Sequence, residues 1–133
     1  MTRHEAREQA FSIIFETIFN SESIDEIILN AVDGRDLEID SFARRLCDET
    51  ISYKDEADKI IDEYSHKWKI NRLPKTTLAI LRMAITELDK FDDIPVSVTA
   101  NEAVELAKTY AVEEDAAYIN GILGAYIKNK ENK

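Results

Sequence analysis

Two arginines near the start of the chain have the spacing of an anion site. Arg3 and Arg7 are four residues apart, so on a helix their side chains lie on one face, about one turn from each other. The positive end of the helix dipole would strengthen such a site. Side chains in this arrangement can contact neighbouring phosphates of a nucleic acid. The alternative is an ordinary first helical turn in which Glu5 and Glu8 balance the two charges.

Two tyrosines and a third arginine could also make contacts with a ligand. Unpaired bases of single-stranded RNA stack on aromatic side chains, which makes Tyr110 and Tyr118 candidate platforms. Both tyrosines also fit the core, and helical spacing leaves the choice open. Arg82 interrupts the apolar run 78–85, where a charge must be paired, reach the surface or lie at an interface. An internal salt bridge is the alternative to an interface.

The sequence does not support an enzyme. Glu63 and His66 have the Glu-x-x-His spacing of di-iron bundles, but a bundle needs two such motifs and the sequence has one. The three glycines do not form a phosphate-binding loop. Cys47 lies on an apolar helical stripe, which favours a buried hydrophobic role over a nucleophile. We therefore expect no catalytic residue, no metal and no cofactor.

Composition favours one acidic, helical domain. The chain has 133 residues and a net charge of −10, which argues against coating nucleic acid by bulk electrostatics. The charge is uneven, because residues 66–90 carry six Lys or Arg against two Asp or Glu. The length predicts a single domain over residues 1–133. One cysteine, no signal-peptide pattern and no apolar run of membrane-spanning length predict a cytoplasmic protein that does not enter a membrane.

Apolar residues recur three and four apart along the whole chain, which predicts about seven helices joined by short polar connections. The central helix should follow Pro74, because residues 78–85 are apolar except for Arg82. The expected helices cover about residues 3–19, a short segment capped by Ser21 or Ser23 and ending near Gly34, 39–47, 57–68, a segment that starts at Pro74 and is ended by Asp92, Asp93 and Pro95, a segment from Ser97 or Thr99 to Tyr110, and 119–127.

Two details of the last helices carry specific expectations. Thr99 and Glu102 have the spacing of a capping box, which would place a helix start at Thr99. Asn120 and Gly121 are weak helix formers inside an apolar repeat. They predict a close approach of another helix at Gly121 and a hydrogen bond from Asn120, a structural role and not a ligand contact.

Four segments of the sequence resemble the NusB family of bacterial transcription antitermination factors. They are the opening RHEARE at residues 3–8 with Ile14-Phe15 after it, LRMAITEL at 81–88 followed by Ile94-Pro95, NEAVELAK at 101–108 and YINGIL at 118–123. Their order and spacing match over essentially the whole chain. The resemblance implies an all-helical fold of two packed halves and a single RNA-binding domain.

The resemblance also implies a function and a set of contacts. Family members bind the boxA element of nascent RNA together with the ribosomal protein NusE, and this complex helps RNA polymerase to read through terminators in ribosomal RNA operons. RNA polymerase would be reached indirectly, through that complex. The family's RNA contacts fall here on Arg3, His4, Arg7, Lys108 and Tyr110, and its partner contacts on Phe15, Arg82 and Tyr118.

Two other interpretations stay open at the level of sequence. The first is a helical protein-interaction module, either a homodimer or a NusE-binding protein, that does not bind RNA directly. The second is an accessory domain like the NusB-like RNA-binding region of some ribosomal RNA methyltransferases, which the absence of an attached catalytic domain disfavours.

Overall fold

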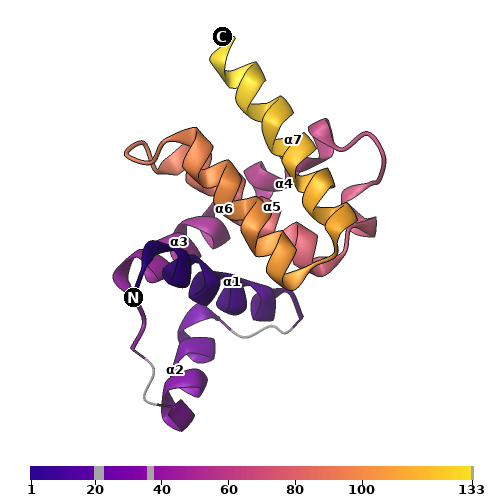
Figure 1. Ribbon diagram of the computed structural model, residues 1–133. Helices are drawn as coiled ribbons and strands as arrows, with labels where there is room; N and C mark the ends of the chain where they lie inside the picture. Colours follow the sequence, from indigo (N-terminus) through magenta and orange to yellow (C-terminus); the bar gives the residue numbers. More distant parts are fainter. Residues whose placement is uncertain (20–22, 36–37, 133) are drawn as a thin grey trace.

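The computed structural model describes residues 1–19, 23–35 and 38–132 (Figure 1). Over these residues the chain forms seven α-helices, one 3-10 turn and no β-strand, as the sequence predicts. The elements are α1 (Arg3–Phe19), α2 (Ile24–Arg35), α3 (Ser41–Ser52), α4 (Lys54–Tyr64), η1 (Ile70–Arg72), α5 (Lys75–Lys90), α6 (Val96–Tyr110) and α7 (Glu113–Glu131).

Helix α5 is the centre of the fold, which confirms the prediction from its apolar run. Every residue from Thr77 to Glu87 is buried except Arg82. The helix packs against α1 and α3 and also against α4, α6 and α7. Because α1 packs on α2 and α3, and α7 packs on α4 and α6, the two groups of helices meet across α5. The described residues therefore share one core and form a single domain.

Local sequence explains several helix starts. Asp40 precedes α3, and its Oδ1 accepts hydrogen bonds from the backbone N–H groups of Phe42 (2.8 Å) and Ala43 (3.1 Å). Ser23 precedes α2 and accepts from the backbone N–H of Glu26 at 3.2 Å. The other predicted cap for α2, Ser21, lies outside the described residues. Gly34 is within the last turn of α2, which continues to Arg35.

Two predicted helix boundaries are wrong, and the residues that suggested them make tertiary contacts instead. Helix α4 ends at Tyr64, and Trp68 lies in the connection that follows, with its ring centroid 5.5 Å from that of Tyr118. Helix α6 begins at Val96, after Pro95, so Thr99 lies inside the helix and does not cap it. The Thr99 hydroxyl instead donates to Glu87 of α5 at 2.9 Å.

The predicted close approach at Gly121 is also wrong. Gly121 is exposed, and a Cβ built on it would have nothing within 4 Å. Asn120 is exposed as well. The residues that bury α7 are its neighbours Ile119, Ile122 and Leu123, so the pair lies on the outer face of the helix.

A carboxylate at the end of α5 joins the C-terminal helix to the core. Asp89 accepts hydrogen bonds from the hydroxyls of Tyr53 (2.7 Å) and Tyr126 (2.6 Å) and pairs with Lys130. Burial opposes ionisation of Asp89, but these hydrogen bonds outweigh it and hold its pKa below the ordinary value. None of the helices described is both long and apolar enough to cross a membrane.

Candidate nucleic-acid interface

Hydrogen bonds join the first turns of α1 to α6, and they involve two predicted site residues, His4 and Tyr110. His4 Nδ1 lies 2.6 Å from a carboxylate oxygen of Glu102, and its Nε2 lies 3.6 Å from Glu8. The hydrogen bond with Glu102 raises the pKa of His4 above its ordinary value, against the opposing effect of burial. The Tyr110 hydroxyl donates to Glu8 at 2.8 Å. His4 and Tyr110 are therefore brought to one edge of the molecule.

Arg7 does not share a surface with Arg3, so the predicted pair of phosphate-binding arginines does not form. The Arg7 side chain is 3% exposed and lies against Glu87, with Nε–Oε2 and Nη2–Oε1 distances of 3.1 and 2.5 Å. Thr99 donates to the same carboxylate. A buried charge is stable only with such partners. Arg7 therefore joins α1 to α5 and is not available to a ligand.

Arg3 instead lies close to an arginine that the sequence interpretation missed. The guanidinium carbon of Arg3 is 4.0 Å from the ring centroid of Phe42, and that of Arg45 is 3.9 Å from the ring centroid of Phe91. The two rings pack edge-on, 5.5 Å apart. Both arginines are exposed, and both line a shallow cavity of about 320 Å³. We call this surface the Arg3–Arg45 edge.

The charges of these two arginines are not neutralised by ion pairs. Within the described part of the chain, neither guanidinium has a carboxylate oxygen within 4.0 Å. Asp93 lies in the same cavity lining without forming a pair. Contact with an aromatic ring restricts a guanidinium to one plane. Among the described residues, the hydrogen bond that these two groups donate runs from Arg45 Nη2 to the backbone carbonyl of Lys90 at 3.5 Å, so most of their N–H donors stay available. The edge therefore offers two positioned cationic planes to an anion.

The sequence indicated that an arginine of this helix could be available to a ligand, but it did not show which of two adjacent arginines is already paired. Arg44 and Arg45 are adjacent on a helix whose outer face is otherwise acidic. Arg44 forms ion pairs with Asp25 and Asp48 at 2.7 and 3.0 Å. Only the tertiary structure shows that Arg44 is the paired arginine and that Arg45 packs on Phe91.

An aromatic row runs along α1, beginning at Tyr110 of α6. Tyr110 stacks on Phe11 with ring centroids 4.9 Å apart, Phe11 lies 5.7 Å from Phe15, and Phe15 lies 4.8 Å from Phe19. Tyr110 is 44% exposed and Phe19 is 62% exposed, while Phe15 is half-buried between them. The row leaves aromatic surface accessible at both of its ends.

The other predicted contacts lie apart from this row. Lys108 is exposed near the end of α6 and pairs with Glu105 at 3.5 Å. Arg82 forms a two-point ion pair with Asp58 of α4, at 2.7 and 2.9 Å, so its charge is used internally. Tyr118 is half-buried and hydrogen-bonds to Ser65. These two side chains hold α4 and the segment after it against α5 and α7.

The basic stretch predicted from the sequence lies elsewhere on the molecule. Lys67, Lys69 and Arg72 are exposed on the connection between α4 and α5, and Lys75 is exposed at the start of α5. Figure 1 shows this connection on the opposite side of the molecule from the N-terminus. Glu8, Glu102 and Glu105 surround His4 and Lys108, so the α1–α6 side is mixed in charge rather than basic. Cationic groups without partners on the N-terminal side are thus concentrated at the Arg3–Arg45 edge.

The described residues contain no cluster of three or more His, Cys, Asp or Glu side chains that could hold a metal ion. Cys47 is fully buried, and burial raises the pKa of its thiol to about 12, so it stays protonated near neutral pH. Cys47 therefore has the buried, unreactive role that its place on the apolar stripe predicts.

Several known proteins are similar to this chain in sequence and in fold. The model of the NusB family matches residues 4–128. The transcription antitermination protein NusB of Clostridium acetobutylicum is 41% identical over 138 residues, which cover 100% of both chains. The structure of T. maritima NusB has a TM-score of 0.85 at 31% identity, over 96% of this chain and 92% of that one. A structure of antitermination factors NusB and NusE in complex with dsRNA has a TM-score of 0.83 at 25% identity, over 97% and 99%.

Proposed function

The chain belongs to the NusB family, whose relatives named above are transcription antitermination proteins and not enzymes, and we propose that it is an antitermination factor. In this proposal it binds boxA RNA together with NusE and promotes read-through in ribosomal RNA operons. It acts in the cytoplasm and reaches the elongating RNA polymerase only as part of that complex. A relative of similar fold has been solved with NusE and dsRNA, which supports this choice of partners.

The observation that carries the RNA proposal is the Arg3–Arg45 edge. Two guanidinium groups without ion pairs, each fixed on a phenylalanine ring, match what phosphates and unpaired bases require. His4, Lys108 and Tyr110 extend the proposed RNA surface along α6. Because these three already contact carboxylates, their contribution is smaller than that of the two arginines.

In this proposal Arg7 does not contact RNA, and it affects RNA binding only by holding α1 in place. Its ion pair with Glu87 fixes the axis of α1 relative to α5. Arg3 lies one turn earlier on α1, so this contact sets where the Arg3 side chain meets Phe42. Loss of the pair would displace the RNA contact without removing a charge from the interface.

We place the NusE contacts on Phe15, Arg82 and Tyr118. Phe15 belongs to the aromatic row, and aromatic side chains are enriched in protein interfaces. Arg82 and Tyr118 act by holding α4 and the following connection in place, through Asp58 and Ser65. Joining a protein contact to a weak RNA contact raises the overall affinity for the correct complex. The acidic body disfavours unspecific RNA.

A titration of labelled RNA tests the proposal. Fluorescence anisotropy is followed for a boxA RNA and for a scrambled RNA of the same length, with this protein alone and with NusE, at physiological salt. We expect preferential binding of boxA that tightens when NusE is present. NusE pairing without any RNA preference would favour the alternative of a protein-interaction module. A stable homodimer that neither NusE nor RNA alters would contradict the antitermination proposal and favour the homodimer form of that alternative.

A further inference from the structure

Asp93 is a carboxylate within the cationic Arg3–Arg45 edge. It lines the cavity of about 320 Å³ together with Arg3 and Arg45. Among the described residues, no Lys, Arg or His nitrogen lies within 4.0 Å of the Asp93 carboxylate oxygens. The cavity therefore holds two positive charges and one negative charge that are not joined in ion pairs.

The backbone fixes the place of Asp93. It lies in the turn between α5 and α6, where the backbone N–H of Ile94 donates to the carbonyl of Phe91 at 3.2 Å. Phe91 is buried and contacts the Arg45 guanidinium through its ring, and Ile94 packs against the core. The position of Asp93 beside Arg45 is therefore set by the fold and not by an ion pair.

The other carboxylate near Arg3 already has a structural role. Arg3 and Phe42 also line a neighbouring hollow of about 360 Å³, whose acidic residue is Asp40. Asp40 caps α3 by accepting two backbone hydrogen bonds. Asp93 has no such role, because α6 begins after Pro95 without a side-chain cap. Of the two carboxylates, Asp93 is the one that the fold does not use.

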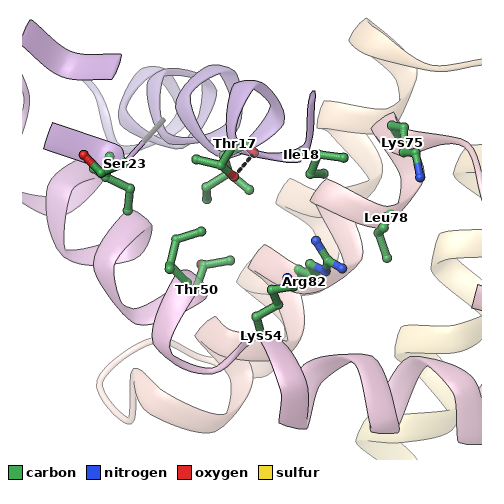
Figure 2. A pocket seen from close by; sticks show the side chains of 11 residues that line it. Thr17, Ile18, Ser23, Thr50, Lys54, Lys75, Leu78 and Arg82 are labelled. Atoms are coloured by element: carbon green, nitrogen blue, oxygen red, sulfur yellow. Dashed lines mark hydrogen bonds between the residues drawn. The ribbon is translucent and has the colours of Figure 1, made fainter. Parts of the chain in front are cut away.

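Two other cavities do not combine unpaired charges of both signs. The cavity of about 440 Å³ between α1, α2, α3 and the starts of α4 and α5 has three cationic residues in its lining and no Asp or Glu (Figure 2). Of these cations, Arg82 is already paired with Asp58. In the groove between α6 and α7, Lys108 is paired with Glu105. Neither cavity offers unpaired cations and an unpaired carboxylate together.

A carboxylate at this place weakens phosphate binding but suits base recognition. Because like charges repel, Asp93 opposes any phosphate that contacts Arg3 or Arg45. The part of a nucleotide that a carboxylate binds is a base edge with N–H donors. The Watson–Crick edge of guanine has two adjacent donors, N1–H and N2–H, which match the two carboxylate oxygens. The other three RNA bases carry no such pair of adjacent donors on this edge.

We propose that Asp93 determines sequence specificity by binding the Watson–Crick edge of one unpaired guanine. This inference rests on the proposed function, because it assigns a base contact within the same RNA surface. The guanine lies in the cavity beside the guanidinium planes of Arg3 and Arg45, on which bases can stack, and donates to Asp93. The two arginines supply affinity for RNA of any sequence, and Asp93 supplies the preference.

Removing the charge of Asp93 has opposite effects in a base-binding residue and in a solvated acid. Asp93→Asn and the matched control Asp92→Asn each remove one negative charge at an exposed position, and Asp92 lies outside the cavity lining. Anisotropy titrations with boxA RNA and scrambled RNA are made with NusE present, at physiological salt. We expect Asp93→Asn to bind boxA RNA at least about fivefold more weakly than wild type does, and to bind scrambled RNA equally or more tightly.

The control should keep the wild-type preference for boxA RNA, because Asp92 contacts no base in this arrangement. A solvated acid beside two arginines only repels RNA, so its removal would tighten binding of every RNA. Binding of boxA RNA by Asp93→Asn that equals or exceeds wild-type binding would therefore overturn the proposal.

Replacing guanosine by inosine tests the contact itself, because inosine lacks only the N2 amino group. Each guanosine of the boxA RNA is replaced in turn. At one position, inosine should weaken binding to wild type at least about threefold and leave binding to Asp93→Asn unchanged. Equal effects of inosine on the two proteins at every position would overturn the assignment to guanine.

Wild-type binding separates the role of Asp93 from the function as a whole. If wild type and Asp93→Asn prefer boxA RNA to the same extent, the antitermination proposal stands and the role of Asp93 is refuted. If wild type shows no preference for boxA RNA, the proposed function fails, and the role of Asp93 fails with it.

Discussion

Arg7 of α1 and Glu87 of α5 form an ion pair in which both side chains are only 3% exposed. Thr99 of α6 donates to the same carboxylate, so one buried group connects three helices. The sequence separates Arg7 from Glu87 by 80 positions. The orientation of α1, and with it the Arg3–Arg45 edge, depends on this contact.

Removing one member of the pair should destabilise the fold strongly. Arg7→Met leaves the Glu87 carboxylate buried with one hydroxyl donor, and we expect it to lower the free energy of unfolding by about 3–5 kcal/mol. Urea denaturation measures the change. The control Lys108→Met removes the cation of an exposed pair with Glu105 and should change stability by less than about 1 kcal/mol. Equal effects of the two substitutions would contradict a structural role for Arg7.

His4 should make stability depend on pH near neutrality. Its pKa is raised in the folded chain, so protonated His4 favours folding. The contribution is complete below the unfolded pKa of about 6.5 and is lost as pH rises through the higher folded pKa. We expect wild type to be more stable than His4→Gln at about pH 5.5, with the difference disappearing at alkaline pH. A difference that grows with pH would contradict the contact with Glu102.

Asp89 should have the opposite dependence on pH. Its folded pKa is lowered, so its contribution is present above the unfolded pKa of about 3.9 and is lost as pH falls through the folded value. Asp89→Asn should therefore lower stability by about 1–3 kcal/mol at neutral pH and by less in acid. Denaturation at several pH values measures this. Asp93→Asn, at an exposed carboxylate, is the control and should show no such pattern.

The sequence predicts the helices and the centre of this fold because burial follows a helical period. The errors arise where the type of a residue fits a local helical pattern and also fits a contact with a residue on another helix. Thr99 has the spacing of a helix cap, and Arg7 has the spacing of a surface arginine, yet both bind Glu87. Neither contact has a periodic signal, because the partner lies on another helix. A local pattern therefore cannot show whether such a residue has the local role or contacts another helix.

The candidate site was predicted less completely than the fold for the same reason. Arg3 could be selected from its place at the start of α1. Arg45 could not, because its environment is made by Phe91, 46 positions later in the sequence. The net positive segment 66–90 suggested a basic face, but Lys67, Lys69 and Arg72 lie on the far connection, whereas Lys90 lies at the end of α5 beside Arg45. Charge along the sequence does not show which charges share a surface.

We expect RNA to bind at the Arg3–Arg45 edge and not at the basic connection between α4 and α5. The most direct test is the anisotropy titration of boxA RNA, over a range of salt concentrations in the presence of NusE, with two matched double variants. Arg3→Ala with Arg45→Ala should weaken binding at least tenfold and reduce the salt slope by about 1.4, as expected for two lost contacts to single-stranded RNA. Lys69→Ala with Arg72→Ala should leave both quantities unchanged. The reverse result, with binding lost in the second variant and kept in the first, would contradict the account.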